Sequence, residues 1–389
     1  MPLSRKLRLL RIHERRQVLL DSLKPSLEIS QFWEHQTPYL PLADSMVETA
    51  VGCIEIPVGV VQGLLVNGIP YDLPLATEEP SVCAAATFGA AIVARGGGFT
   101  AEADEPRIRA QIFLENCTQA SQVLIMNARS QFESLAEPLL DTMTQRGGGL
   151  RNLGTHWHPL TCLLELWFEV DVRDAMGANL MNTMAETLSP LAEEVSGGRK
   201  LMAILTNEGS CRLARSRFEV ETRHLARAGV EGNEVARRIV LASELAWEDS
   251  RRAVTHNKGI MNGVSALALA TGNDTRALEA AVHQFAIKDG LYRSLSRYHL
   301  QGNHLVGELE IPVPLALVGG ATGVHPSAKL YLALTQAQTA RQLGCLAASL
   351  GLAQNLAALL ALVTEGIQKG HMSLHARRES FKNNSKENP

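Results

Sequence analysis

The stretch AVTHNKGIMNG at residues 253–263, followed by TGND at residues 271–274, is the most informative part of this 389-residue chain. Its glycines and asparagines predict loops between packed segments, and these loops place Lys258 and Asp274 in one patch. A lysine near a carboxylate in a desolvated pocket can stabilise a developing oxyanion. Taken alone, the patch favours simpler interpretations, with Lys258 as a solvated charge and Asp274 as the N-cap of a helix that begins at Thr275.

The bulk composition is that of an ordinary globular protein. Hydrophobic residues make up 46% of the chain, charged residues 20%, and the formal net charge is -3. This length predicts two or three domains, and the small net charge gives no reason to expect nucleic acid or an acidic membrane as a partner. Six cysteines are scattered singly with no CxxC pair, which predicts reduced, buried thiols in a cytoplasmic protein.

Two segments resemble targeting or membrane sequences. Residues 5–16 are basic, but no continuous apolar run follows them, so we expect an amphipathic surface or dimer-contact helix rather than a secretory signal. Residues 343–363 are rich in alanine and leucine, with Gln354 and Asn355 near the middle. A helix that is apolar on nearly every side also fits the centre of a large protein, so this segment predicts a buried helix and no membrane span.

Turn residues and hydrophobic periodicity predict a mixture of strands and helices. An Asn-Gly pair at residues 67–68 predicts a hairpin, and Ser81 is placed to cap a helix over residues 82–95. The alternation of elements from about residue 107 suggests a compact α+β domain inserted into a larger one. In this domain we expect strands at 108–113, 122–126, 160–172 and 200–205, with helices at 130–146 and 180–195. Elsewhere we expect helices at 231–246, 274–286 and between 326 and 369, and a strand at 304–314.

The run DAMGAN lies between a predicted strand and a predicted helix. Free N–H groups at a helix start, with a glycine that allows close approach, suit a pyrophosphate. No GxGxxG motif follows any predicted strand, so the usual dinucleotide fingerprint is missing. A nucleotide site and a simple tight turn both remain open for the residues of this run, which are Asp174, Ala175, Met176, Gly177, Ala178 and Asn179.

Other polar residues also have two interpretations. Glu79 is either a carboxylate favoured by a helix dipole or a catalytic acid kept protonated by desolvation. His371 follows a predicted helix and is either a cap partner or a proton donor to a leaving group. His156 and His158 share one face of a predicted strand, but no second group of ligands lies nearby in the sequence, so we expect no metal site.

Four motifs together resemble one family. EEPS at 78–81, DAMGAN at 174–179, the patch at 255–274 and GHM at 370–372 occur in the order and spacing of class II, the bacterial and soluble form of 3-hydroxy-3-methylglutaryl-CoA (HMG-CoA) reductase. The similarity extends from about residue 1 to residue 377 and includes VGGAT at 318–322 and GLAQNL at 351–356. The DAMG and HNKG runs are highly specific to that family.

The resemblance implies an α+β fold, with a large mixed α/β substrate domain and an inserted small α+β domain that binds the nucleotide. The small domain is expected to be ferredoxin-like rather than a Rossmann fold. The expected boundaries are 1–106 and 213–377 for the large domain, 107–212 for the small domain and 378–389 for a disordered tail. Class II enzymes continue beyond the histidine as a mobile flap, so the C-terminal flap domain is expected to be missing here.

The resemblance also implies the chemistry, which is a two-step reduction of HMG-CoA to mevalonate and CoA for isoprenoid biosynthesis, or the reverse oxidation. Lys258 would stabilise the oxyanion and Asp274 would bind and tune that lysine. Glu79 would protonate the carbonyl oxygen of the aldehyde stage, and His371 would protonate the departing CoA thiolate. The residues that match family positions for binding the hydroxymethylglutaryl end are Ser81, Arg252 and Asn262.

The family implies two reduced nicotinamides per turnover, held by the DAMGAN loop, with no metal. Relatives that prefer NADH carry an acid where this chain has Asn152, so we expect NADPH or dual use. Family members are homodimers, or assemblies of dimers, whose active sites are shared between subunits. The alternative is a reductase-derived scaffold protein that is catalytically weak because its flap is missing. One further departure is ETAVG at 48–52, where the family usually has ENVIG.

Overall fold

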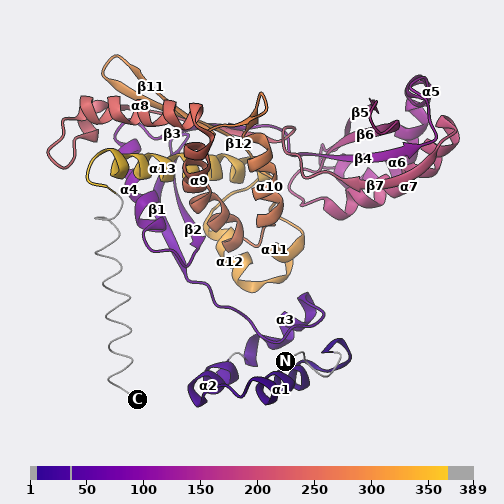
Figure 1. The fold of residues 1–389 in the computed structure, drawn as a ribbon, viewed down its shortest axis with the longest axis horizontal. Helices are drawn as coiled ribbons and strands as arrows, with labels where there is room; N and C mark the ends of the chain where they lie inside the picture. Colours follow the sequence, from indigo (N-terminus) through magenta and orange to yellow (C-terminus); the bar gives the residue numbers. More distant parts are fainter. Residues whose placement is uncertain (1–6, 36, 367–389) are drawn as a thin grey trace. The chain divides into compact units, whose positions relative to one another are not determined.

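The computed structural model describes residues 7–35 and 37–366, and the chain forms two compact units divided between Pro57 and Val58 (Figure 1). His371 and the predicted tail at 378–389 lie outside the described residues. The domain boundaries expected from the family differ from this division, and they stay a prediction.

The first unit is helical, and two of its arginines are internal. Arg15 and Arg16 are only 6% and 7% exposed, which corrects the expectation that this basic helix lies wholly at a surface. Arg15 Nη1 donates to Asp44 at 2.5 Å, and Arg16 lies over the ring of Trp33 at 4.9 Å. Buried charges persist only when they are paired and hydrogen-bonded, so these contacts hold the unit together. Its elements are η1 (Leu7–Leu9), α1 (Ile12–Leu23), α2 (Leu27–His35), η2 (Thr37–Tyr39) and α3 (Leu40–Met46).

The second unit contains a six-stranded sheet in the order β11-β12-β8-β3-β1-β2. Neighbouring strands are antiparallel except β1 and β3, which are parallel. The predicted hairpin is confirmed, because Asn67 and Gly68 both have positive φ (51° and 80°) and join β1 to β2. The strands are β1 (Val58–Val66), β2 (Ile69–Ala76), β3 (Phe99–Ala103), β8 (Leu213–Glu221), β11 (Ser296–Gln301) and β12 (His304–Pro312).

A central helix, α13 (Ala340–Val363), fills the core beside this sheet (Figure 1). It packs against α4 (Val82–Ala94) and α9 (Ser250–Ala270). Glycines allow the close approach, since a Cβ at Gly89 would lie 2.1 Å from the Ala353 carbonyl oxygen. Within the described residues, α13 is the one helix long and apolar enough to cross a membrane, but 78% of its apolar window is buried in the protein. The prediction of a buried helix is confirmed.

The remaining elements around this sheet are short or peripheral. They are η3 (Thr222–Leu225), α8 (Gly232–Glu248), α10 (Thr275–Phe285), β9 (Ile287–Lys288), β10 (Leu291–Tyr292), α11 (Gly320–Val324) and α12 (Pro326–Leu334).

A second sheet, in the order β5-β6-β4-β7, has a hydrophobic core of its own. All its neighbouring strands are antiparallel. Residues 121–127 form a helix, so the predicted strand at 122–126 is wrong. The apolar run there buries only Ile125 and leaves Val123 60% exposed. A run this short does not distinguish the hydrophobic period of a helix from that of a strand. The elements are β4 (Arg107–Glu115), α5 (Ser121–Asn127), α6 (Arg129–Thr144), β5 (Gly149–His158), β6 (Leu163–Asp171), α7 (Ala178–Ser196) and β7 (Arg199–Leu205).

The patch at residues 253–263 is helical, which corrects the prediction of loops. All of it belongs to α9, where the buried residues recur at helical spacing and include His256, Ile260 and Val264. Packing of this face against α13 outweighs the poor helix propensity of Gly259 and Gly263.

The prediction that the cysteines are buried also needs correction, because Cys345 is buried but Cys162 is exposed.

Candidate active site

A cavity of about 420 Å³ lies between the start of α4, α9 and α13, and we call it the α9 cavity. It brings together five side chains predicted to act in one site, from segments almost two hundred residues apart. Apolar side chains of α4 and α13 form much of the remaining wall, together with polar residues such as Arg227 and Gln354. The five predicted side chains are Glu79, Ser81, Arg252, Lys258 and Asn262.

Helix α9 supplies one wall of the α9 cavity because the residues on one of its faces recur at helical spacing. Arg252, Thr255, Gly259 and Asn262 are three or four residues apart, and all of them line the cavity. Glu79 and Ser81 come from the turn between β2 and α4. Ser81 has φ 76°, a left-handed backbone conformation that is uncommon for a residue other than glycine. Such conformations concentrate at ligand-binding segments.

The charges in the α9 cavity are mostly uncommitted. Within the described part of the chain, neither Glu79, Arg252 nor Lys258 forms an ion pair. Arg227, which also lines the cavity, is paired with Glu365 and is therefore largely neutralised. The cavity consequently presents two free cations and one free carboxylate, which suits an anionic ligand whose charge increases during a reaction.

A buried polar network begins in the wall of the α9 cavity, at His256 and Asn355, and continues into the core. His256 Nε2 lies 2.6 Å from Ser296 Oγ, and Ser296 Oγ donates to Asn355 Oδ1 at 2.8 Å. The next residue of α9, Asn257, donates to the Arg293 carbonyl and accepts from the Leu295 backbone N–H. These contacts fix α9 against β11 and α13, so the backbone that carries Lys258 is rigid.

Asp274 lies elsewhere, in a smaller cavity of about 80 Å³ that also includes Met176 and Ala178. The prediction that Asp274 caps a helix is confirmed, since its carboxylate accepts from the backbone N–H groups of Arg276 and Ala277. Burial raises the pKa of Asp274, but the Arg276 guanidinium and these N–H groups outweigh burial, and the net pKa is lowered. Asp274 is therefore ionised at neutral pH.

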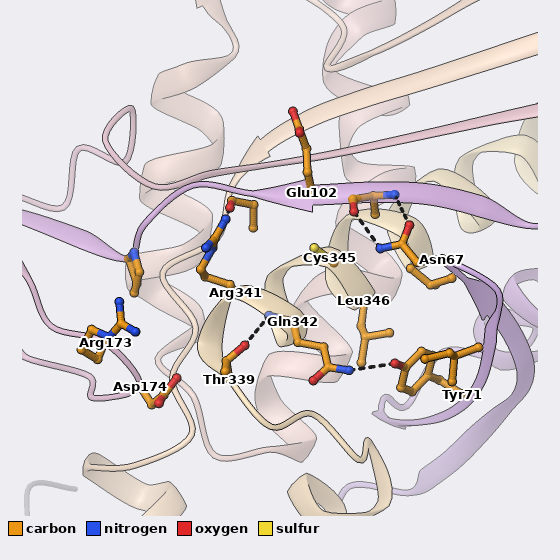
Figure 2. Close-up of a pocket in the computed structure, with 15 residues that line it drawn as sticks. Asn67, Tyr71, Glu102, Arg173, Asp174, Thr339, Arg341, Gln342, Cys345 and Leu346 are labelled. Atoms are coloured by element: carbon orange, nitrogen blue, oxygen red, sulfur yellow. Dashed lines mark hydrogen bonds between the residues drawn. The ribbon is translucent and has the colours of Figure 1, made fainter. Parts of the chain in front are cut away.

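The DAMGAN loop is anchored to the main body of the second unit. Asp174 Oδ1 accepts from the Ala340 N–H at the start of α13 at 2.7 Å, and the Met176 N–H donates to the Val318 carbonyl at 3.0 Å. Figure 2 shows Asp174 beside the first turn of α13 in the wall of a further cavity of about 520 Å³. Gly177 has φ 72° and immediately precedes α7, where a Cβ would lie 2.7 Å from Val172 Cγ1.

The start of α7 is suited to an anion. The first N–H groups of a helix lack acceptors within the helix, and they follow the sharp turn at Gly177. The structure thus commits the Asp174 carboxylate to α13 and places Ala178 in the wall of the smaller cavity that also contains Asp274. The residues present fit a nicotinamide dinucleotide phosphate group at this position.

Asn152 lies on β5 and its side chain is held by a neighbouring carboxylate. Asn152 Nδ2 donates to Glu169 Oε2 at 2.7 Å, and Arg109 binds the other Glu169 oxygen at 2.6 Å. Burial raises the pKa of Glu169, but the hydrogen bonds from Asn152 and Arg109 outweigh burial, and the net pKa is lowered. An ionised Glu169 favours an amide over a second carboxylate at position 152.

Comparison with known proteins identifies the family. The family model described as "Hydroxymethylglutaryl-coenzyme A reductase" matches residues 11–376. The chain is 40% identical over 346 residues to the 3-hydroxy-3-methylglutaryl-coenzyme A reductase of Archaeoglobus fulgidus, with 87% of this chain and 77% of that protein covered.

The chain belongs to the hydroxymethylglutaryl-coenzyme A reductase family.

Other members of the reductase family agree. The probable reductase of Borreliella burgdorferi is 38% identical over 334 residues, which cover 86% of this chain and 77% of that protein. The class II reductase from Streptococcus pneumoniae, solved bound to NADPH in open conformations, superposes with a TM-score of 0.81 at 38% identity. That match covers 92% of this chain and 99% of the solved chain. The chain is thus an oxidoreductase with the class II fold, and the scaffold alternative is not favoured.

Two residues that line the α9 cavity, Arg227 and His256, have no role predicted from the sequence motifs. Arg227 has no local motif and enters the cavity only through the tertiary fold. His256 lies inside the HNKG run but was given no role. The structure brings Lys258 together with Glu79 and leaves Asp274 in a separate cavity of this chain.

His256 also predicts a pH dependence of folding. Burial, with a smaller contribution from the Arg252 cation, lowers the pKa of His256 from 6.5 to about 4. Between these two pH values the unfolded chain binds more protons than the folded chain. The titration of His256 therefore leaves the free energy of unfolding unchanged above pH 6.5 and lowers it as the pH falls toward 4. The loss from this group corresponds to about 3 kcal/mol in the free energy of unfolding at pH 4 relative to pH 7.

Urea unfolding at pH 7 and at pH 4.5 of the natural protein and of His256→Gln measures this contribution. The variant lacks the titrating imidazole, and its stability should therefore decrease less between the two pH values. An equal decrease in both proteins would show that His256 does not titrate on unfolding.

Proposed function

We propose that this chain catalyses the two-step reduction of HMG-CoA to mevalonate and CoA, and that the same residues serve the reverse oxidation. The observation that carries this proposal is the convergence of Glu79, Ser81, Arg252, Lys258 and Asn262 on one cavity. The family membership supports it independently. We further propose a cytoplasmic location, in keeping with the bacterial and archaeal relatives.

Each charged group of the α9 cavity has a task in this proposal. Arg252 binds the terminal carboxylate of the substrate through paired N–H donors, with Ser81 and Asn262 beside it. Lys258 stabilises the negative charge that develops on the carbonyl oxygen in both reductions, and Glu79 donates a proton to that oxygen at the aldehyde stage. A bound reduced nicotinamide supplies the hydride. His371 donates a proton to the CoA sulfur as the carbon–sulfur bond of the thiohemiacetal breaks, so CoA leaves as a thiol together with the aldehyde.

We propose that the smaller α+β part is the cofactor domain. Its chain order is β4, α5 and α6, β5, β6, α7 and β7, and its sheet order is β5-β6-β4-β7, which is the ferredoxin-like arrangement. The first turn of α7 would hold the cofactor's pyrophosphate through backbone N–H groups.

We propose that a functional site requires two copies of the chain. The α9 cavity contains the substrate-binding residues and Lys258, whereas Asp274 lies with Met176 and Ala178 of the cofactor loop. Phe88 and Leu362 line the α9 cavity and are 37% and 42% exposed, which leaves an apolar rim. A second copy that covers this rim would bring its Asp274 and cofactor loop to Lys258 and would exclude water from Glu79.

We propose NADPH or dual cofactor use. Asn152 is neutral and its amide is held by Glu169, so no carboxylate at position 152 repels a 2′-phosphate. The cofactor bound to the Streptococcus pneumoniae structure is NADPH.

A spectrophotometric assay tests the proposed function. Purified protein with HMG-CoA should oxidise two equivalents of NADPH for each CoA released, and NADPH should serve at least as well as NADH at equal concentration. In Asn152→Asp, use of NADPH should fall about tenfold relative to NADH because a carboxylate at position 152 then repels the 2′-phosphate. Absence of HMG-CoA-dependent oxidation with either cofactor contradicts the function, and a strong NADH preference of the natural protein contradicts the cofactor proposal.

A further inference from the structure

One buried nitrogen, on a residue that lines the α9 cavity, has no explanation in the proposed mechanism. His256 lines the cavity and is 2% exposed, yet its Nδ1 has no hydrogen-bond partner among the described residues. Most buried polar atoms in folded proteins are hydrogen-bonded, and an unsatisfied one is costly. An unsatisfied nitrogen on a residue that lines a cavity points to a ligand group that completes it.

The surrounding network determines which role this nitrogen has. Asn355 Oδ1 accepts from Tyr298 Oη and from Ser296 Oγ, each at 2.8 Å. The single hydroxyl hydrogen of Ser296 is thereby used, so Ser296 Oγ accepts from His256 Nε2–H. A neutral imidazole with its hydrogen on Nε2 has a lone pair on Nδ1. Burial and Arg252 lower the pKa of His256 to about 4, which keeps the ring neutral at pH 7. Nδ1 is therefore a fixed hydrogen-bond acceptor.

The residue that carries this acceptor lines the proposed substrate site. His256 is four residues after Arg252, and Asn262 is six residues further along α9. All three line the α9 cavity. The acceptor is thus one helical turn from the group proposed to bind the substrate carboxylate.

The chemistry of the substrate then selects the donor. The hydroxymethylglutaryl group carries a carboxylate and a thioester carbonyl, which only accept hydrogen bonds, a methyl group, and one hydroxyl on C3. That hydroxyl is the one donor of the acyl group. We propose that His256 Nδ1 accepts a hydrogen bond from the 3-hydroxyl and thereby selects 3-hydroxy acyl thioesters over their deoxy analogues. This inference rests on the proposed function and assigns a specificity residue within it.

Two substitutions at position 256 distinguish the contribution of Nδ1 from that of Nε2. In His256→Gln the side-chain amide can reach Ser296 in place of Nε2, but the acceptor at the Nδ1 position is lost. In His256→Asn the amide oxygen lies near the Nδ1 position, and the contact with Ser296 is lost. The probes are HMG-CoA and 3-methylglutaryl-CoA, which differ only in the 3-hydroxyl, and their affinities are measured by isothermal titration calorimetry without turnover.

We expect the natural protein to bind HMG-CoA at least about tenfold more tightly than 3-methylglutaryl-CoA. His256→Gln should lose this preference, with affinity for 3-methylglutaryl-CoA unchanged within about twofold. His256→Asn should retain part of the preference. If thermal melting shows that His256→Gln does not fold, Ser296→Ala is used as the second variant. It frees the imidazole from Ser296 and should likewise lower the preference.

Three results overturn the inference. The first is a natural protein that binds both thioesters equally. The second is an equal loss of affinity for both thioesters in His256→Gln, which would mean that an ordered water occupies Nδ1. The third is binding of neither thioester, which contradicts the proposed function as well. Selective binding of HMG-CoA without its reduction would instead refute the proposed function and support the assignment of His256.

Discussion

Replacing Lys258 with alanine is expected to lower kcat/KM for the reduction of HMG-CoA by at least about 1000-fold. Lys258 and Arg252 are the two cations of the α9 cavity without an ion pair in the described chain, and Arg252 is assigned to the substrate carboxylate. Among the described residues that line the α9 cavity, no other ammonium group is then available to stabilise the oxyanion. Because both reductions create that charge, the reduction of free mevaldehyde should fall in parallel.

Steady-state kinetics with both substrates and a matched control measure this effect. Lys200→Ala removes an exposed lysine from β7, outside the α9 cavity, and should retain full activity. The Tm of Lys258→Ala should stay close to that of the natural protein, because Lys258 is exposed in the single chain and its loss leaves no cavity. A Lys258→Ala enzyme that keeps more than a tenth of its activity on either substrate would falsify the role of this residue.

A mixture of two inactive variants is expected to recover activity. Lys258→Ala and Asp274→Ala should each be inactive alone, because the lysine requires a carboxylate that tunes it. If each site combines the α9 cavity of one chain with Asp274 of another, a mixed dimer contains one intact site. Random pairing of equal amounts in a twofold dimer then restores about one quarter of the natural activity, and isolated mixed dimers should have about one half.

The control pair distinguishes residues on one chain from residues on two. Glu79 and Lys258 line the same cavity of one chain, so Glu79→Gln mixed with Lys258→Ala should give no recovery. The variants are coexpressed with different affinity tags, the mixed dimers are isolated, and NADPH oxidation is measured. If the Lys258→Ala and Asp274→Ala pair remains inactive in isolated mixed dimers, Asp274 serves the lysine of its own chain, and the two-chain site is wrong.

Local sequence signals predicted those parts of the fold that depend on neighbouring residues. The Asn67-Gly68 pair specifies a tight hairpin because both residues tolerate positive φ. Asp274 was correctly placed at a helix N-cap, since its short carboxylate reaches the next free N–H groups. The apolar composition of residues 343–363 similarly predicted the core helix α13. In each case, the physical cause lies within a few residues or in the composition of one segment.

The wrong predictions came from segments in which distant packing outweighs local preference. The glycines of residues 253–263 suggested loops, but burial of His256 and Ile260 against the rest of the second unit makes this stretch helical. Residues 121–127 form α5 although their apolar run suggested a strand. The arginines of α1 looked like a surface charge, and only the fold supplies the Asp44 carboxylate that buries Arg15.

The sequence by itself determined the family, because its motifs are specific in composition, order and spacing, and it named the side chains of the candidate site. Only the tertiary structure decided which of these side chains share a cavity. Glu79 and Lys258 line one cavity because α4 and α9 both pack on α13, whereas Asp274 lies in another cavity with the cofactor loop. The tertiary structure also gave His256 its neutral, oriented imidazole. Burial and a hydroxyl from a strand forty residues away produce that state, and neither is encoded in the residues next to it.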